Sequence, residues 1–257
     1  MNGRDALSIA VLLPDVLGTY SDAGNAVVLA QRARWRGLDA DIVPVLADDT
    51  PPAGCDIYLL GGGEDTAQVF AVDWLAGHRD VLGAMSGSAV TFAVCAGLQI
   101  LGTTLIDGSG YSRDGLGLLD LSTAPARARA VGELVSECDV PGVGLLTGFE
   151  NHRGTTTLGP DARPLGKVCS GIGNGAPHPG GAVDGAVQGD IVATYMHGPA
   201  LARNPALADH LLWRATGAPF DDADMPDVPD LPALRRTYLA ATGRIRATPR
   251  AARPGRR

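Results

Sequence analysis

The segment Ala89–Gly102 constrains the fold of this chain most strongly. An apolar run rich in β-branched residues ends at Cys95, a small residue and Gly97 follow, and an apolar pattern of helical type comes next. This order is typical of a strand, a tight turn and a helix, with the turn residue at the end of a sheet. Gly97 suits the turn because a Cβ there would obstruct the helix as it passes the strand. We expect the helix N-terminus to favour a reactive thiolate at Cys95; a buried structural cysteine is the alternative.

The rest of the chain alternates between strand and helix patterns. Five segments precede the cysteine strand: strands over 7–13, 40–45 and 56–60, and helices over 26–36 and 66–86. This alternation predicts an α/β fold with a doubly wound, mostly parallel sheet and flanking helices. Short strands and many glycines predict extra antiparallel strands and loops over 107–193, followed by a helix over 200–216.

These patterns divide the chain into one large domain and a C-terminal extension. We expect the domain over 1–217, an acidic, proline-rich linker with a short helix (231–242) over 218–243, and a basic disordered tail over 244–257. A solvated tail is the simpler interpretation, and weak contact with anionic lipid is the alternative.

Composition excludes several classes of function. The chain has 257 residues, of which 45% are hydrophobic, and its net charge of −7 argues against a general nucleic-acid binder. Its four cysteines form no CxxC pair, which argues against a zinc site and a disulfide scaffold. We find no signal peptide and no apolar stretch near the roughly 20 residues of a membrane span, and therefore expect a cytoplasmic protein.

Two further features predict catalytic groups near Cys95. Gly61, Gly62 and Gly63 follow a predicted strand, where backbone N–H groups can hold an oxyanion; an ordinary turn is the alternative. His197 ends another predicted strand and can serve as the base for a thiol. His152, flanked by polar residues, is the rival, and we rank His197 first.

Together these motifs resemble the class I glutamine amidotransferases of the cobyric-acid-synthase-like branch, and most closely the GatD-type glutaminase subunits. The resemblance spans roughly residues 7–217. It rests on six motifs in order: Tyr20–Asn25, Gly61–Asp65, Val94–Gly102, Gly115–Asp120, Gly148–His152 and Thr194–Pro199.

The resemblance implies a role for each matching residue. Cys95 would be the nucleophile and His197 the base, and Arg129 would hold the substrate, with Arg127 as the near alternative. Four other residues are expected to contact substrate: Gly62, Ala96, Gln99 and His152. No metal site is expected.

One departure concerns the acid that orients the histidine. Many class I enzymes have a His-x-Glu motif, whereas the second residue after His197 is Pro199. The histidine can be oriented by an acid elsewhere in the chain or by an acid from a partner chain. Alternatively, the cysteine and histidine act as a dyad without an acid. The resemblance favours the partner, and hence a glutaminase that is slow alone.

The resemblance also implies a reaction and partners. The chain would hydrolyse L-glutamine through a cysteine thioester and pass ammonia to a MurT-type Mur ligase in a heterodimer. That ligase would amidate D-glutamate of lipid II to D-isoglutamine in peptidoglycan synthesis. No Walker-type motif is present, so no cofactor is expected in this chain. The resemblance implies that ATP and Mg bind the partner. The alternatives are a glutaminase for another acceptor, as in cobyrinate-type amidation, and a non-catalytic glutamine-binding scaffold.

Overall fold

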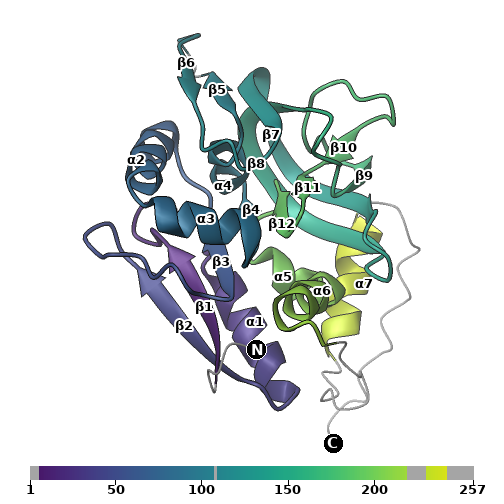
Figure 1. The fold of residues 1–257 in the computed structure, drawn as a ribbon. Coiled ribbons are helices and arrows are strands. Elements are labelled where there is room, and N and C mark those ends of the chain that lie inside the picture. Colours follow the sequence, from purple (N-terminus) through teal and green to yellow (C-terminus); the bar gives the residue numbers. More distant parts are fainter. Residues whose placement is uncertain (1–5, 107–108, 219–229, 242–257) are drawn as a thin grey trace, which may run out of the picture.

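Two sheets with flanking helices make up the fold, which we describe from a computed structural model (Figure 1). The structure describes residues 6–106, 109–218 and 230–241. The expected basic tail lies outside these residues, as does the expected linker apart from residue 218 and the helix at 230–241.

The first sheet has six strands in the order β11-β12-β4-β3-β1-β2. All neighbours are parallel except β11, which is antiparallel to β12. The strands are β1 (Ala6–Leu12), β2 (Asp39–Val45), β3 (Ile57–Leu60), β4 (Val90–Val94), β11 (Ala186–Gln188) and β12 (Ile191–Thr194).

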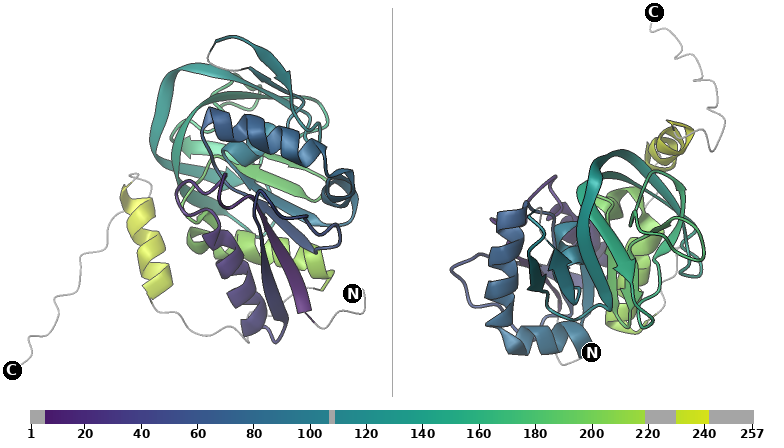
Figure 2. Two further views of the ribbon diagram at one scale, coloured as in Figure 1. Left: turned by 90° about the vertical axis from the view of Figure 1, so that its left-hand side faces the viewer. Right: turned by 90° about the horizontal axis from the view of Figure 1, so that it is seen from above.

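Helices cover both faces of this sheet, which explains its apolar strands. Every residue of β3, β4 and β12 is buried, as expected for parallel strands with two covered faces. Figure 2 shows α2 (Asp65–Ala76) and α3 (Arg79–Gly87) on one side of the sheet and α1 (Gly24–Trp35) on the other. The predicted doubly wound α/β fold is confirmed.

Two expected helices are each divided in the structure. The segment 66–86 forms α2 and α3 because Gly77 and His78 interrupt it, with His78 at φ −114° and ψ 66°. The segment 200–216 forms α5 (Ala200–Arg203) and α6 (Pro205–Thr216), since Asn204 is not helical and Pro205 starts a new helix. Our expectation of single helices was wrong at both places.

The second sheet lies beside the first and is mostly antiparallel. Its path is β10-β9-β7-β5-β6, and β8 pairs with β7. Its long central pair differs from the short strands we expected over 107–193. The strands are β5 (Thr104–Ile106), β6 (Ser112–Asp114), β7 (Leu121–Cys138), β8 (Leu145–Leu158), β9 (Gly166–Ser170) and β10 (Val183–Asp184).

A last helix, α7 (Asp230–Ala241), lies near the second sheet, where we expected a helix over 231–242 (Figure 1). The side chain of Arg235 anchors it by donating to the carbonyl oxygens of Leu145 and Arg203. None of the helices among the described residues combines the length and apolarity that crossing a bilayer requires.

Candidate active site

Three adjacent strands of the first sheet end at one edge and carry the predicted groups there. The glycines at 61–63 follow β3, Cys95 follows β4, and His197 lies three residues beyond the end of β12. The register pairs Leu60 with Ala93, and Val94 with Thr194, so the strands end level with one another. Carboxyl ends of parallel strands are where open α/β sheets place their ligands.

Cys95 occupies the strained turn that the sequence predicted. Its backbone has φ 52° and ψ −104°, a conformation that residues other than glycine rarely adopt. Its N–H donates to the Thr194 oxygen at 2.9 Å, which fixes the turn to β12. A Cβ on Gly97 would lie 2.8 Å from the Leu60 Cβ, so α4 (Ala96–Ile100) approaches β3 too closely for any larger residue.

The Cys95 side chain is a thiol at rest. It is only 7% exposed, and burial raises the pKa of the thiol to about 12, with the Asp22 carboxylate as the next cause. The Ala96 N–H and Arg129 act in the opposite direction and are outweighed. Our expectation of a reactive thiolate at the helix N-terminus was wrong, because burial outweighs the Ala96 N–H and keeps the thiol protonated. Attack therefore requires a base.

His197 presents one nitrogen to a carboxylate and keeps the other available. Its Nδ1 lies 2.8 Å from Oδ2 of Asp22, while its buried Nε2 has no hydrogen-bond partner among the described residues. Its backbone N–H donates to the Phe149 oxygen of β8 at 2.8 Å, which ties the first sheet to the second. The imidazole and Cys95 line the same cavity.

Asp22, which was not among the predicted site residues, is the carboxylate in contact with His197. It lies in the loop between β1 and α1 and is 3% exposed. Its motif, Tyr20–Asn25, supported the family resemblance, but sequence spacing cannot show that a loop 175 residues from His197 meets it.

Gly62 borders His197 so closely that no side chain would fit. A Cβ there would lie 2.5 Å from Cε1 of His197 and 3.2 Å from Oδ2 of Asp22. Its N–H donates to the same Asp22 oxygen at 3.0 Å. This N–H is therefore already paired, and Ala96 is the better candidate of the two for holding an oxyanion.

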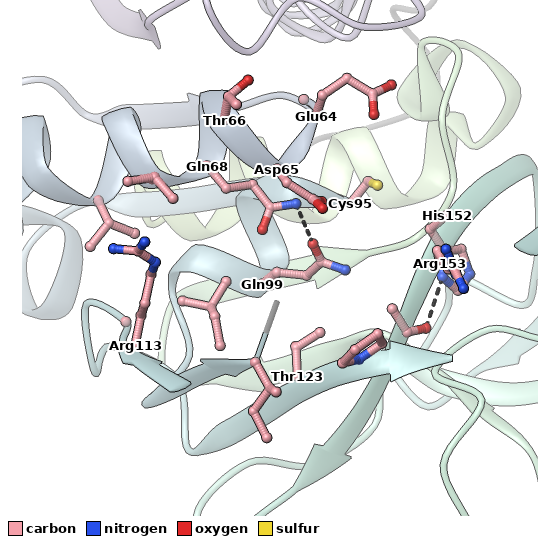
Figure 3. Close-up of a pocket in the computed structure, with 18 of the residues that line it drawn as sticks. Glu64, Asp65, Thr66, Gln68, Cys95, Gln99, Arg113, Thr123, His152 and Arg153 are labelled. Atoms are coloured by element: carbon pink, nitrogen blue, oxygen red, sulfur yellow. Dashed lines mark hydrogen bonds between the residues drawn. The ribbon is translucent and has the colours of Figure 1, made fainter. Parts of the chain in front are cut away.

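A cavity of about 930 Å³ opens in front of these groups and extends between α2 and the second sheet. Figure 3 shows Gln68 and Gln99 pointing toward each other beside Cys95, with Thr123 on another part of the wall. Gln99 is paired at both ends, because its Oε1 accepts from Gln68 and its Nε2 donates to the Tyr195 hydroxyl. Gln99, which we expected to contact substrate, therefore lines the cavity with its side-chain amide held by two hydrogen bonds.

Arg129 reaches this cavity from an irregularity in β7. Pro125 pairs with Gly154 and Ala130 with His152, so residues 126–129 stand opposite Arg153 alone. The bulge brings Arg129 to the cavity, where its Nε donates to Oδ1 of Asn151, whereas Arg127 is not among the described residues that line it.

His152, the rival base, also lines the cavity but is held differently. It is buried, its ring stacks on Tyr195 with centroids 3.7 Å apart, and its Nδ1 lies 3.0 Å from the Gly154 oxygen. Its Nε2 lies 3.5 Å from Oε2 of Glu150. These contacts fit a structural role in the wall better than proton transfer at Cys95.

Comparison with known proteins agrees with this geometry. Residues 8–205 match the model of the CobB/CobQ-like glutamine amidotransferase domain. The chain belongs to this family. It is a glutamine amidotransferase, as the sequence motifs predicted.

Two curated relatives match nearly the whole amidotransferase. The subunit GatD of lipid II isoglutaminyl synthase (glutamine-hydrolyzing) from Staphylococcus aureus is 33% identical over 88% of this chain and 93% of its own length. The subunit of the same name from Streptococcus pneumoniae is 32% identical over 88% of this chain and 86% of its length. The predicted resemblance to GatD-type subunits is confirmed.

The fold is also that of solved amidotransferases. A crystal structure of a glutamine amidotransferase superposes with a TM-score of 0.56 at 22% identity, covering 82% of this chain and 99% of the other. At this identity the likeness concerns the fold alone.

Proposed function

We propose that this amidotransferase is the glutamine-hydrolysing subunit of a lipid II isoglutaminyl synthase. The observation that carries the proposal is the match to GatD over almost the full length of both chains, combined with a cysteine and a histidine lining one cavity. In this role the chain supplies ammonia, and a MurT-type Mur ligase in the same heterodimer amidates D-glutamate of lipid II to D-isoglutamine. The pair would act in the cytoplasm during peptidoglycan synthesis.

The reaction begins with proton transfer from the thiol. Nε2 of His197 takes the proton of Cys95 as the sulfur attacks the side-chain amide carbon of L-glutamine. The pKa of about 12 supports a transfer concerted with attack, because the free thiolate is scarce at neutral pH. The Ala96 N–H stabilises the negative oxygen of the tetrahedral intermediate.

Collapse of the intermediate releases ammonia and leaves a thioester. His197 returns its proton to the departing nitrogen, and the C–N bond breaks to give ammonia and a γ-glutamyl thioester on Cys95. Water then attacks the thioester with His197 as the base, which releases glutamate and restores the thiol. Arg129 binds the α-carboxylate of glutamine at the mouth of the cavity during both steps.

The ligase step belongs to the partner. The chain has no Walker-type sequence, so ATP and Mg are expected to bind the Mur-type subunit, where the α-carboxyl of D-glutamate is activated. Ammonia that escapes to bulk water is protonated and loses its nucleophilicity. Direct transfer within a heterodimer avoids this loss.

Reconstitution tests the proposal. The chain is purified with the Mur-ligase-like protein that co-purifies from the native cytoplasm and is incubated with lipid II, ATP, Mg and glutamine. We expect D-isoglutamine and glutamate in equal amounts, both abolished by Cys95→Ala, while free ammonia restores amidation by that variant. Amidation of a cobyrinate-type acceptor by a different co-purifying ligase would contradict the assignment of the acceptor. Wild-type glutamate release no higher than that of Cys95→Ala would contradict the enzyme itself.

A further inference from the structure

The buried carboxylate of Asp22 accepts hydrogen bonds from the catalytic histidine and from two backbone N–H groups beside it. Its Oδ2 accepts from His197 Nδ1 at 2.8 Å and from the Gly62 N–H at 3.0 Å. Its Oδ1 lies 3.3 Å from the Gly198 nitrogen, which donates to it. Three donors from two segments therefore converge on one acid.

The pairing sets the hydrogen position on His197. A carboxylate can only accept, so Nδ1 must carry the hydrogen of the neutral imidazole. The lone pair then lies on Nε2, which is buried and has no hydrogen-bond partner in the part of the chain that the structure describes. This is the form of histidine that can take a proton from a thiol, and the nearby negative charge stabilises the imidazolium that results.

The loop that carries Asp22 is fastened to the segment after His197. The Asn25 side chain accepts a hydrogen bond from the Leu201 N–H at 2.9 Å and donates one to the backbone carbonyl oxygen of Asp22 at 2.9 Å. A Cβ on Gly24 would lie 2.5 Å from Cγ of Pro199. Pro199 thus occupies the position of the acid in His-x-Glu enzymes and packs against the loop that brings a different acid to the histidine.

The backbone of this loop indicates that Asp22 is held in place. Tyr20 and Ser21 have φ values of 58° and 60°, a conformation that residues other than glycine rarely adopt and that persists only where the surroundings enforce it. The Tyr20 ring also lies 4.9 Å from the His197 ring, measured between centroids. Two residues of the motif Tyr20–Asn25, Tyr20 and Asp22, therefore contact the base His197 directly.

We propose that Asp22 is the positioning residue of the glutaminase, and that this chain supplies from its own β1–α1 loop the acid that orients His197. The inference rests on the proposed function and deepens it. It replaces our expectation of an acid from the partner. Asp22 touches neither substrate nor the reacting atoms, and it acts by fixing the tautomer of His197 and by stabilising its charged form.

Asp22→Asn tests the inference, since it keeps the size of the side chain and removes the charge. We expect kcat for glutamine hydrolysis to fall about a thousandfold with KM changed less than threefold. The acid limb of the kcat/KM profile should move to lower pH, because the imidazolium loses its negative partner. The other titratable groups that face the reacting pair are Tyr20, Glu64, Arg129 and Tyr195, and they are the same in the wild type and the variant.

The matched control is Asp56→Asn. This carboxylate accepts two hydrogen bonds from Ser8 at the opposite edge of the sheet, so its loss tests the general cost of removing a paired acid. We expect kcat within twofold of wild type. Circular dichroism and the thermal midpoint of each variant establish folding. The pH dependence of Cys95 alkylation by iodoacetamide gives a second readout, which should change only in Asp22→Asn.

The outcomes separate this inference from the proposed function. A Cys95→Ala variant as active as wild type removes the function itself. If Cys95→Ala is inactive while folded Asp22→Asn keeps wild-type kcat and pH profile, only the role of Asp22 is lost. If Asp22→Asn recovers wild-type kcat when the Mur-ligase-like partner is added, the partner supplies the acid that orients His197. That result would overturn the inference.

Discussion

The two sheets contribute to the site in different ways. The parallel sheet presents Cys95, His197 and Asp22, all less than 10% exposed and fixed by backbone hydrogen bonds or by one another. The antiparallel sheet presents Arg129 and Arg153, which are exposed side chains on and opposite a bulge. Breaking a bond requires fixed geometry, whereas holding a charged substrate requires a cation that solvent and substrate can reach.

Hydrogen bonds beside the cavity join the two regions. The His197 N–H bonds to Phe149 of β8, and the Asn151 amide bridges Arg129 to the Tyr20 hydroxyl. Substrate binding at Arg129 can therefore affect Tyr20, which lies beside the base His197. Four variants or measurements separate the contributions of the two sheets.

The largest effect is expected from the parallel sheet at Cys95. Cys95→Ala removes the nucleophile, and glutamate release should fall by about 10⁴-fold or more, to the background of uncatalysed hydrolysis. Steady-state glutamate assays measure it. Cys169→Ala on β9 is the control and should keep wild-type activity. Equal losses in both variants would point to a general effect of cysteine removal.

Gly62→Ala probes how fixed the parallel edge is. The new Cβ would displace the His197 ring, and a shift of about 1 Å at a reacting group costs on the order of 10²-fold in kcat. Gly87→Ala, at the end of α3, introduces a Cβ that has none of the described residues within 4 Å, and it serves as the control. A Gly62→Ala variant with normal kcat would show that the base tolerates displacement.

Arg129→Ala examines the antiparallel sheet. Loss of a charged hydrogen bond worth roughly 1.5–3 kcal/mol should raise KM for glutamine by about 10- to 100-fold while kcat changes little. Arg127→Ala, from the same bulge, should stay within twofold of wild type. A reversed result would place the substrate contact at Arg127.

The smallest effect is a pH dependence of stability. Because the folded pKa of Cys95 is about 12 and the ordinary value is 9.0, the unfolded chain loses the proton first as pH rises. The folded state should therefore lose stability between pH 9 and 12, by about 1.4 kcal/mol at pH 10. Urea unfolding of wild type and Cys95→Ala at pH 7 and pH 10 measures it. A difference between the two proteins that is the same at both pH values would contradict a buried, protonated thiol.

Local patterns were sufficient for the parallel sheet and for two members of its site. Every position of β3 and β4 is buried and most carry apolar side chains, and the turn at Cys95 needs a small residue and then glycine. Both features can therefore be recognised from consecutive residues. His197 followed from the same logic, since the carboxyl ends of parallel strands share one edge. The break between α2 and α3 was missed because a single glycine is compatible with a continuing helix.

The sequence by itself determined that glycines, a thiol and an imidazole each follow a strand, together with the family that these motifs define. Only the tertiary structure decided that Asp22 meets His197, that the bulge of β7 brings Arg129 to the cavity, and that burial keeps Cys95 protonated. Each of these depends on groups distant in the chain being packed together, and on the water that packing removes. Residue spacing carries no record of either.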